Sequence, residues 1–94
     1  MLIRSQNKIT LIKFENIVIN INNINGKEII CWSQMNPGED EYISLGHYST
    51  KAKAMKVLDM IQEAYCKFMS VKNDDAWDRK ESVFYMPEDS EMEI

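Results

Sequence analysis

The segment from Ser49 to Ser70, STKAKAMKVLDMIQEAYCKFMS, is the longest stretch of the chain with helical periodicity. Projected at about 100° per residue, its apolar residues fall on one side and its charged residues on the other, which predicts an amphipathic helix. The apolar stripe consists of Ala54, Val57, Leu58, Ile61, Ala64, Tyr65, Phe68 and Met69. Ser49 or Thr50 can cap the helix N-terminus, because a side-chain oxygen accepts an unpaired backbone N–H there. Such a helix is marginal alone, so the rest of the chain must bury the stripe.

Strand-like segments precede and follow this helix. Their apolar residues, often alternating with polar ones, are bounded by turn-forming residues, as expected for short strands. The segments are Leu2–Arg4, Ile9–Phe14, Ile17–Ile24, a following strand that ends near Ser33, Tyr42–Tyr48 and, after the helix, Ser82–Met86. Gly46 is expected to mark a bulge or a close backbone approach. Short connections between successive strands favour antiparallel pairing.

Asn25-Gly26 is the strongest turn signal in the chain, and it favours a two-residue type I′ hairpin. That turn sets the pairing of the two strands that it joins. It places Ile24 opposite Lys27, Ile21 opposite Ile30, and Ile19 opposite Trp32. The predicted face toward the helix consists of Ile17, Ile19, Ile21, Ile30 and Trp32.

These elements predict an α+β fold. An antiparallel meander of about five strands packs on one long amphipathic helix, and a short final strand pairs parallel to an earlier strand or lies at an edge. A chain of 94 residues has the size of one domain with a modest core. We assign residues 1–87 to that domain and residues 88–94 to an acidic flexible tail.

The composition of the chain limits where the protein can work and what it can bind. The chain has no apolar run long enough to span a membrane, and its first residues, MLIRSQNK, do not resemble a signal peptide. Cys31 and Cys66 lack the spacing of a metal or redox motif, so we interpret them as reduced thiols of a cytoplasmic protein. The net charge of −4 disfavours direct binding to nucleic acid, which needs cations against phosphates.

No catalytic signature is found in the sequence. His47 is the single histidine, and three glycines are too few for a phosphate-binding loop. The acidic groups at 39–41 and 74–75 do not have the spacing of a calcium-binding loop. We therefore expect no enzyme activity, no metal and no cofactor. Catalysis by two carboxylates in a cleft stays an open alternative.

The acidic segment around Trp77 is the candidate binding region. A large aromatic residue among charges is typical of an interface anchor, although it can also fold back over the end of the helix. The acidic C-terminal third either mimics nucleic-acid charge toward a basic partner or serves solubility. The candidate protein-binding residues are Trp77, Asp74, Asp75, Asp78, Glu88 and Asp89.

Several segments together resemble a known group of proteins. They are Arg4-Ser5-Gln6, Phe14-Glu15-Asn16-Ile17, Leu45-Gly46-His47-Tyr48-Ser49-Thr50, Lys53-Ala54, Val57-Leu58-Asp59-Met60-Ile61-Gln62 and Val83-Phe84-Tyr85-Met86-Pro87. This pattern is similar to that of small uncharacterised proteins of low-GC Gram-positive bacteria and their prophages. The resemblance implies a phage or mobile-element context and no known enzyme activity. The chain departs from the pattern at Ala52, where an acid is expected, and at residues 73–80, which look like an insertion.

Two functional hypotheses follow. The first is a non-enzymatic protein-binding module of phage or mobile-element origin, for example an inhibitor of a host defence or nucleic-acid enzyme, with a host or phage protein as partner. The second is an oligomeric protein that binds a small ligand such as a nucleotide, with a pocket completed between subunits. No membrane partner is expected, and a homodimer is left open.

Overall fold

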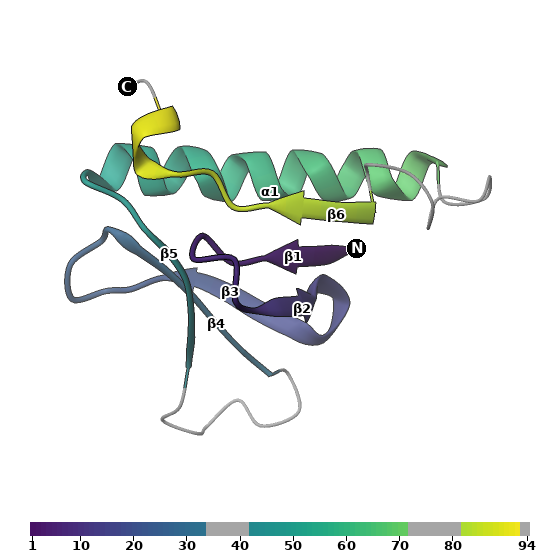
Figure 1. Cartoon of the computed structure of the whole chain (residues 1–94), viewed down its shortest axis with the longest axis horizontal. Coiled ribbons are helices and arrows are strands. Elements are labelled where there is room, and N and C mark those ends of the chain that lie inside the picture. The colour runs from purple at the N-terminus through teal and green to yellow at the C-terminus, as the bar shows by residue number, and fades with distance from the viewer. Residues whose placement is uncertain (34–41, 72–81, 93–94) are drawn as a thin grey trace.

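The computed structural model describes residues 1–33, 42–71 and 82–92, apart from the side chain of Val71. The elements occur in the order β1 (Leu2–Arg4), β2 (Leu11–Lys13), the 3-10 turn η1 (Phe14–Asn16), β3 (Ile17–Ile21), β4 (Glu28–Ser33), β5 (Ile43–His47), α1 (Lys51–Val71), β6 (Val83–Tyr85) and the 3-10 turn η4 (Asp89–Glu91). Six strands in two sheets pack with one long helix (Figure 1), which confirms the predicted α+β class.

The strands divide into two three-stranded sheets, with orders β2-β1-β6 and β3-β4-β5. Three of the successive pairs are antiparallel as expected, namely β1 with β2, β3 with β4, and β4 with β5. The meander is interrupted between β2 and β3, where the 3-10 turn η1 redirects the chain and Phe14 packs on Tyr65 of α1 with ring centroids 4.6 Å apart. After α1, β6 pairs parallel with β1 at a sheet edge, which confirms the prediction for the final strand.

The predicted register of the β3–β4 hairpin is wrong by one residue. Ile19 lies opposite Cys31 and Ile21 opposite Ile29. The connection is longer than a two-residue turn because asparagine side chains hold it: Asn22 Oδ1 accepts the Ile24 N–H at 2.9 Å, and Asn25 Oδ1 accepts the Lys27 N–H at 2.8 Å. Asn25 does not adopt the positive φ that a type I′ turn requires, although Gly26 does, at 68°.

This slip exchanges the two faces of β4, because side chains alternate along a strand. Ile29 and Cys31 are fully buried in the core, whereas Ile30 and Trp32, which were predicted to face the helix, are half-buried on the other face. The β3 residues Ile17 and Ile19 pack against the core as predicted.

Gly46 marks both a bulge and a close approach, as predicted. Gly46 pairs with Ile29 and Ser44 pairs with Ile30, so Leu45 is an extra residue on the β5 side. A side chain at Gly46 would meet Tyr48 and Gln6. The bulge turns the end of β5 toward the start of α1.

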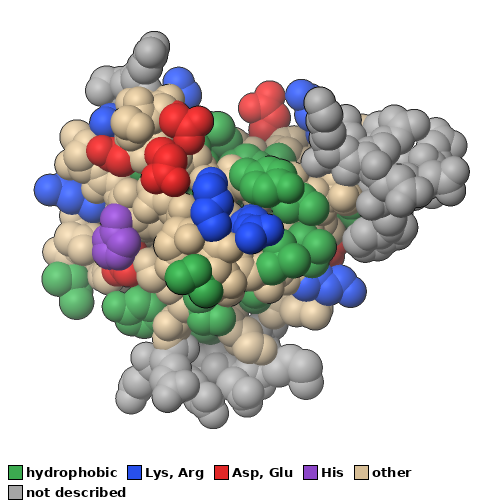
Figure 2. Space-filling view, in the orientation of Figure 1, with side chains coloured by type: hydrophobic (Ala, Val, Ile, Leu, Met, Phe, Trp, Pro, Cys, Tyr) green, Lys and Arg blue, Asp and Glu red, His purple; other side chains and the backbone are tan. Residues whose placement is uncertain are grey.

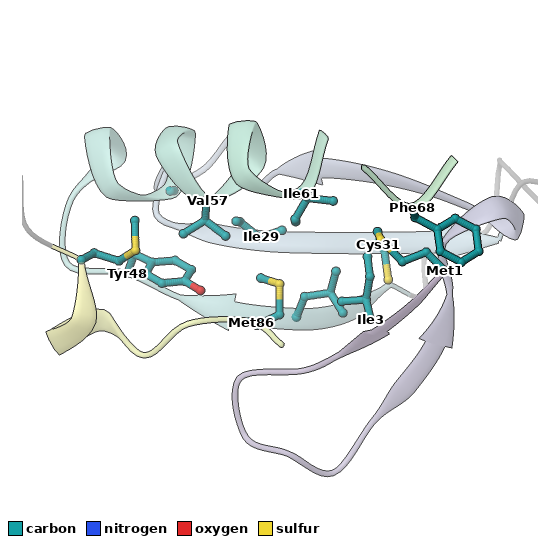
Figure 3. Packing of buried hydrophobic residues seen from close by; sticks show 12 residues of the cluster. Met1, Ile3, Ile29, Cys31, Tyr48, Val57, Ile61, Phe68 and Met86 are labelled. Atoms are coloured by element: carbon teal, nitrogen blue, oxygen red, sulfur yellow. The ribbon is translucent and has the colours of Figure 1, made fainter. Parts of the chain in front are cut away.

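The core lies between the helix and the two sheets (Figure 3). Its fully or nearly buried apolar residues are Met1, Ile3, Ile29, Cys31, Leu45, Tyr48, Ala54, Val57, Ile61, Phe68, Met86 and Met92. The helix stripe is largely as predicted, but Met69 is 43% exposed. Thr50 is the N-cap, because its Oγ1 accepts the Lys53 N–H at 3.1 Å.

The segment 88–92 was predicted to belong to a flexible tail, and the structure corrects this. Met92 is buried in the core, and the η4 turn has a capping box in which Glu91 Oε1 accepts the Glu88 N–H at 2.8 Å. Met92, an apolar residue that follows four polar ones, anchors this segment in the core. Within the described ranges, no helix has the length and apolarity needed to cross a bilayer.

Candidate functional site

The residues predicted to bind a partner divide into two groups. Trp77, Asp74, Asp75 and Asp78 lie outside the described residues. Glu88 and Asp89 lie at the η4 turn, beside the start of α1. Whether any of these six residues contacts a partner stays a prediction.

Asp89 ties the C-terminal segment to the beginning of the helix. Its Oδ1 accepts the Ser49 N–H at 2.7 Å and lies 3.6 Å from Lys53 Nζ. The hydrogen bond from the Ser49 backbone, with help from Lys53, holds the pKa of this carboxyl below its usual value. Glu88 takes part in the capping box and lies 4.0 Å from Lys8 Nζ. Both carboxylates therefore have a structural role.

The described surface offers a different candidate, the outward face of the β2-β1-β6 sheet. Cross-strand pairing sets Leu11, Arg4 and Tyr85 in one row. A second row contains Lys13, Leu2 and Val83, whereas the intervening row, Ile12, Ile3 and Phe84, faces the core. We call the six residues of the two outward rows the outer sheet face. Leu11 is 54% exposed and Tyr85 60% exposed, and Figure 2 shows hydrophobic and cationic side chains gathered over this sheet.

The turn between β1 and β2 extends this surface. Ile9 is 83% exposed, which is unusual for a large aliphatic side chain. The turn that carries it is held by side-chain hydrogen bonds: Ser5 Oγ accepts the Thr10 N–H at 3.0 Å, and Asn7 Oδ1 accepts the Ile9 N–H at 3.0 Å. Ile9 is thus presented to solvent by a rigid turn.

Lys8 and Arg4 complete this turn. Lys8 has a φ of 72°, the left-handed conformation that costs a non-glycine residue about 1 kcal/mol or more. The Arg4 guanidinium donates from Nε and Nη2 to the Lys8 carbonyl at 3.1 and 2.9 Å. Strain held in place by surrounding contacts is frequent at binding sites.

The two charged residues of the outer sheet face are both cationic, although the chain is acidic. Arg4 and Lys13 are both exposed, and neither is within ion-pair distance of a carboxylate in the described parts of the chain. Apolar and aromatic groups with arginine are the residues that protein interfaces favour. The arrangement can therefore bind an apolar surface that carries acidic groups at its margin.

Potentially reactive side chains lie elsewhere. His47 Nε2 is 3.2 Å from Glu28 Oε2, and the imidazole is 68% exposed. Burial raises the pKa of the Cys31 thiol to about 11, so this thiol is inert near neutral pH. Over residues 1–33, 42–71 and 82–92, no three His, Cys, Asp or Glu side chains come together to hold a metal ion.

Sequence reasoning missed the outer sheet face because it treated both N-terminal strands as ordinary parts of a meander. Their signal was weak: Ile9 and Leu11 are apolar but stand two residues apart, next to polar neighbours. Their exposure depends on which face of the β1–β2 hairpin packs on the core, and this is decided by the tertiary structure.

Comparisons of this chain with known protein families, with curated proteins and with solved structures found no significant match.

Proposed function

We propose that this chain is a protein-binding module and that the outer sheet face, extended by Ile9, is its contact surface. The observation that carries the proposal is the row of Leu11, Arg4 and Tyr85 beside a rigid turn that exposes Ile9. Arg4 and Lys13, neither of which forms an ion pair within the described residues, favour a partner with acidic groups around an apolar patch. Binding, and not catalysis, is the activity that this composition supports.

The resemblance to prophage proteins of low-GC bacteria gives the proposal a setting. In that setting the partner is a host or phage protein, and occupying its surface would inhibit it. An acidic host enzyme surface fits the outer sheet face better than a basic groove does. A basic groove would instead be the partner of the acidic residues around Trp77.

The test compares partner capture by matched variants. Tyr85→Ser and Ile9→Ser remove exposed apolar side chains from the proposed surface, and Val18→Ser removes one of 37% exposure from the other sheet. A partner protein captured by the wild type and by Val18→Ser should be lost with the first two variants. With the purified partner, Tyr85→Ser should weaken Kd by about 30-fold, the size of an interface hot spot of about 2 kcal/mol.

Salt dependence tests the charge assignment separately. Exposed charges are screened as ionic strength rises, so added salt should weaken binding of an acidic partner. Arg4→Gln would disturb the turn, and Lys13→Gln is therefore the cleaner variant for this purpose. Undiminished binding by Tyr85→Ser, at equal folding, would refute the proposed surface.

The small-ligand hypothesis has one supporting observation. A hollow of about 270 Å³ lies between the β3–β4 turn and the start of α1, lined by polar Asn20, Asn22 and Asn23 together with Lys51. One lysine is a weak site for a nucleotide phosphate, which makes this the less favoured function. A thermal-shift series with nucleoside mono-, di- and triphosphates tests it, and no stabilisation by any of them would rule out nucleotide binding there.

A further inference from the structure

The two edges of the β3-β4-β5 sheet differ in what covers them. At β5, the Gln6 N–H donates to the Leu45 carbonyl at 2.7 Å, and Gln6 Oε1 accepts the His47 N–H at 2.9 Å. At β3, no strand of the described residues pairs with the outer edge. The fold therefore covers one edge with the N-terminal turn and leaves the other without a paired strand.

The backbone of β3 is oriented to accept another strand. The Asn22 N–H donates to the Glu28 carbonyl at 2.8 Å, which makes this a hydrogen-bonded pair of the ladder. Hydrogen-bonded pairs alternate in antiparallel strands, so Asn20 and Val18 also bond to β4. The N–H and C=O groups of Ile19 and Ile21 consequently point away from β4, toward the outer edge.

The sequence of β3 lacks the charges and proline that usually protect an edge strand against pairing. Natural edge strands carry lysine, proline, bulges or inward-pointing charges that prevent association. The sequence of β3 is IVINI, and residues 16–26 contain no charged side chain and no proline. The β3 edge itself therefore brings no charged side chain against a second copy, despite the net charge of −4.

A groove between β3 and α1 runs beside this edge. Its volume is about 280 Å³, and its lining is mostly apolar. The lining residues are Phe14, Ile17, Ile19, Leu58, Ile61, Gln62, Tyr65 and Cys66. The isoleucines of β3 are only half-buried, so apolar area is left to cover along the groove.

The two walls of the groove are β3 and α1. In each of them, similar residues lie at equal distances before and after a central residue. In β3, antiparallel pairing centred on Ile19 sets Ile17 opposite Ile21 of a second copy, on the same face. In α1, Leu58 and Cys66 lie four residues before and after Gln62, and Met55 and Met69 lie seven before and after it. At about 100° per residue, all five of these positions fall within roughly 40° of Gln62, so they lie on one face of the helix.

The two centres of symmetry lie at the same groove. Ile19 and Gln62 line the same groove. Met55 and Met69 are 45% and 43% exposed, although methionine is apolar. An antiparallel pair of α1 helices would bring Met55 of one copy against Met69 of the other, and would do so twice.

We infer that two copies of this chain form a symmetric dimer about a twofold axis close to Ile19 and Gln62. The two β3 strands join the β3-β4-β5 sheets into one six-stranded sheet, and the two α1 helices pack antiparallel over the joint. A twofold interface of this kind is self-complementary, as the pattern requires. The dimer uses a different surface from the proposed partner site and presents two copies of the outer sheet face, which adds avidity toward a multivalent partner.

The first measurement is the molar mass in solution by sedimentation and light scattering. The expected value is twice the 11.0 kDa of one chain. Met55→Glu should give monomers, because two carboxylates would be buried against methionines. The double variant Met55→Glu, Met69→Lys should restore the dimer, because each glutamate then faces a lysine of the other copy.

A cysteine pair tests the position of the axis. In a Cys66→Ser background, Gln62→Cys should form a disulfide-linked dimer on mild oxidation, since the two thiols meet at the axis. Glu63→Cys is the matched control, because Glu63 is also exposed but lies one residue, about 100°, around the helix. Amide exchange at Ile19 and Ile21 should also slow as protein concentration rises.

A chain that stays monomeric up to its solubility limit would overturn the inference, as would a dimer that Met55→Glu leaves intact. Equal crosslinking at positions 62 and 63 would overturn the placement of the axis. None of these readouts uses a second protein, so their failure is distinct from failure of the proposed partner site.

Discussion

Gly46 lies directly against Tyr48. A β-carbon at Gly46 would stand 3.2 Å from both Cε2 and the hydroxyl oxygen of Tyr48, closer than ordinary contact allows. Tyr48 cannot move freely, because its buried ring is fixed by a hydrogen bond from its hydroxyl to the Pro87 carbonyl at 2.8 Å. The bulge of β5, the start of the helix and the C-terminal segment therefore meet at this one contact.

Gly46→Ala should destabilise the fold by about 1–3 kcal/mol, the usual effect of overpacking a rigid site. Urea unfolding measures this free energy. In a Tyr48→Phe background the additional loss should be smaller, because the ring is released from Pro87 and the hydroxyl is gone. Strictly additive losses would contradict the contact.

Thr50→Ala should cost about 1 kcal/mol of stability, because it removes the side-chain cap of α1. Ser49→Ala is the control: its hydroxyl accepts a hydrogen bond from Lys53 Nζ at 3.0 Å at the surface, where such contacts contribute little. Thermal unfolding of both variants makes the comparison. An equal loss in the two would show that Thr50 is not the effective cap.

Glu15 should contribute to acid sensitivity. Burial alone would raise the pKa of Glu15, but the hydrogen bond from the Met1 ammonium group, at 2.7 Å, and a backbone hydrogen bond outweigh it and lower the pKa below 4.5. A carboxyl with a lowered folded-state pKa stabilises the fold above its ordinary value, and this contribution is lost as pH falls through the folded-state pKa.

The free energy of unfolding should therefore fall as pH drops below about 4.5, and less steeply in Glu15→Gln. Asp89→Asn should reduce the same slope independently, because the pKa of Asp89 is also lowered. Urea unfolding at a series of pH values provides the measurement. A slope unchanged in Glu15→Gln would show that the carboxylate does not contribute in this way.

The two cysteines should react differently with an aromatic disulfide reagent. Cys66 is exposed on the single chain and should react in the folded monomeric variant Met55→Glu, whereas burial raises the pKa of Cys31 to about 11 and blocks access. This folded variant should release one equivalent of chromophore and the denatured protein two. In the inferred dimer Cys66 lies at the interface and should react more slowly. Rapid reaction of folded Cys66→Ser would contradict the burial of Cys31.

Lys8→Gly should stabilise the N-terminal turn by roughly 0.5–1 kcal/mol, because glycine adopts a positive φ without a steric penalty. The hydrogen bonds from Arg4 go to the backbone carbonyl and survive the change. Thermal unfolding measures the gain. A loss of stability would mean that the lysine side chain contributes more than its backbone strain costs.

The sequence was sufficient for features set by local chemistry. The helical periodicity of residues 49–70 predicted the helix, the hydroxyls of Ser49 and Thr50 were the two candidate caps, and Gly46 predicted a bulge or a close backbone approach. Each depends on residues within a few positions of one another, so periodicity and side-chain type are enough.

Only the tertiary structure decided how these elements meet. The β3–β4 register depended on the side chains of Asn22 and Asn25, which lengthened the turn and exchanged Ile30 and Trp32 for Ile29 and Cys31 in the core. The outward direction of Tyr85 depended on β6 pairing with β1, whose residues are about eighty positions earlier in the chain. A hydrophobic pattern indicates that a segment has a face to bury. Which element covers that face is decided by contacts between residues that are distant in sequence.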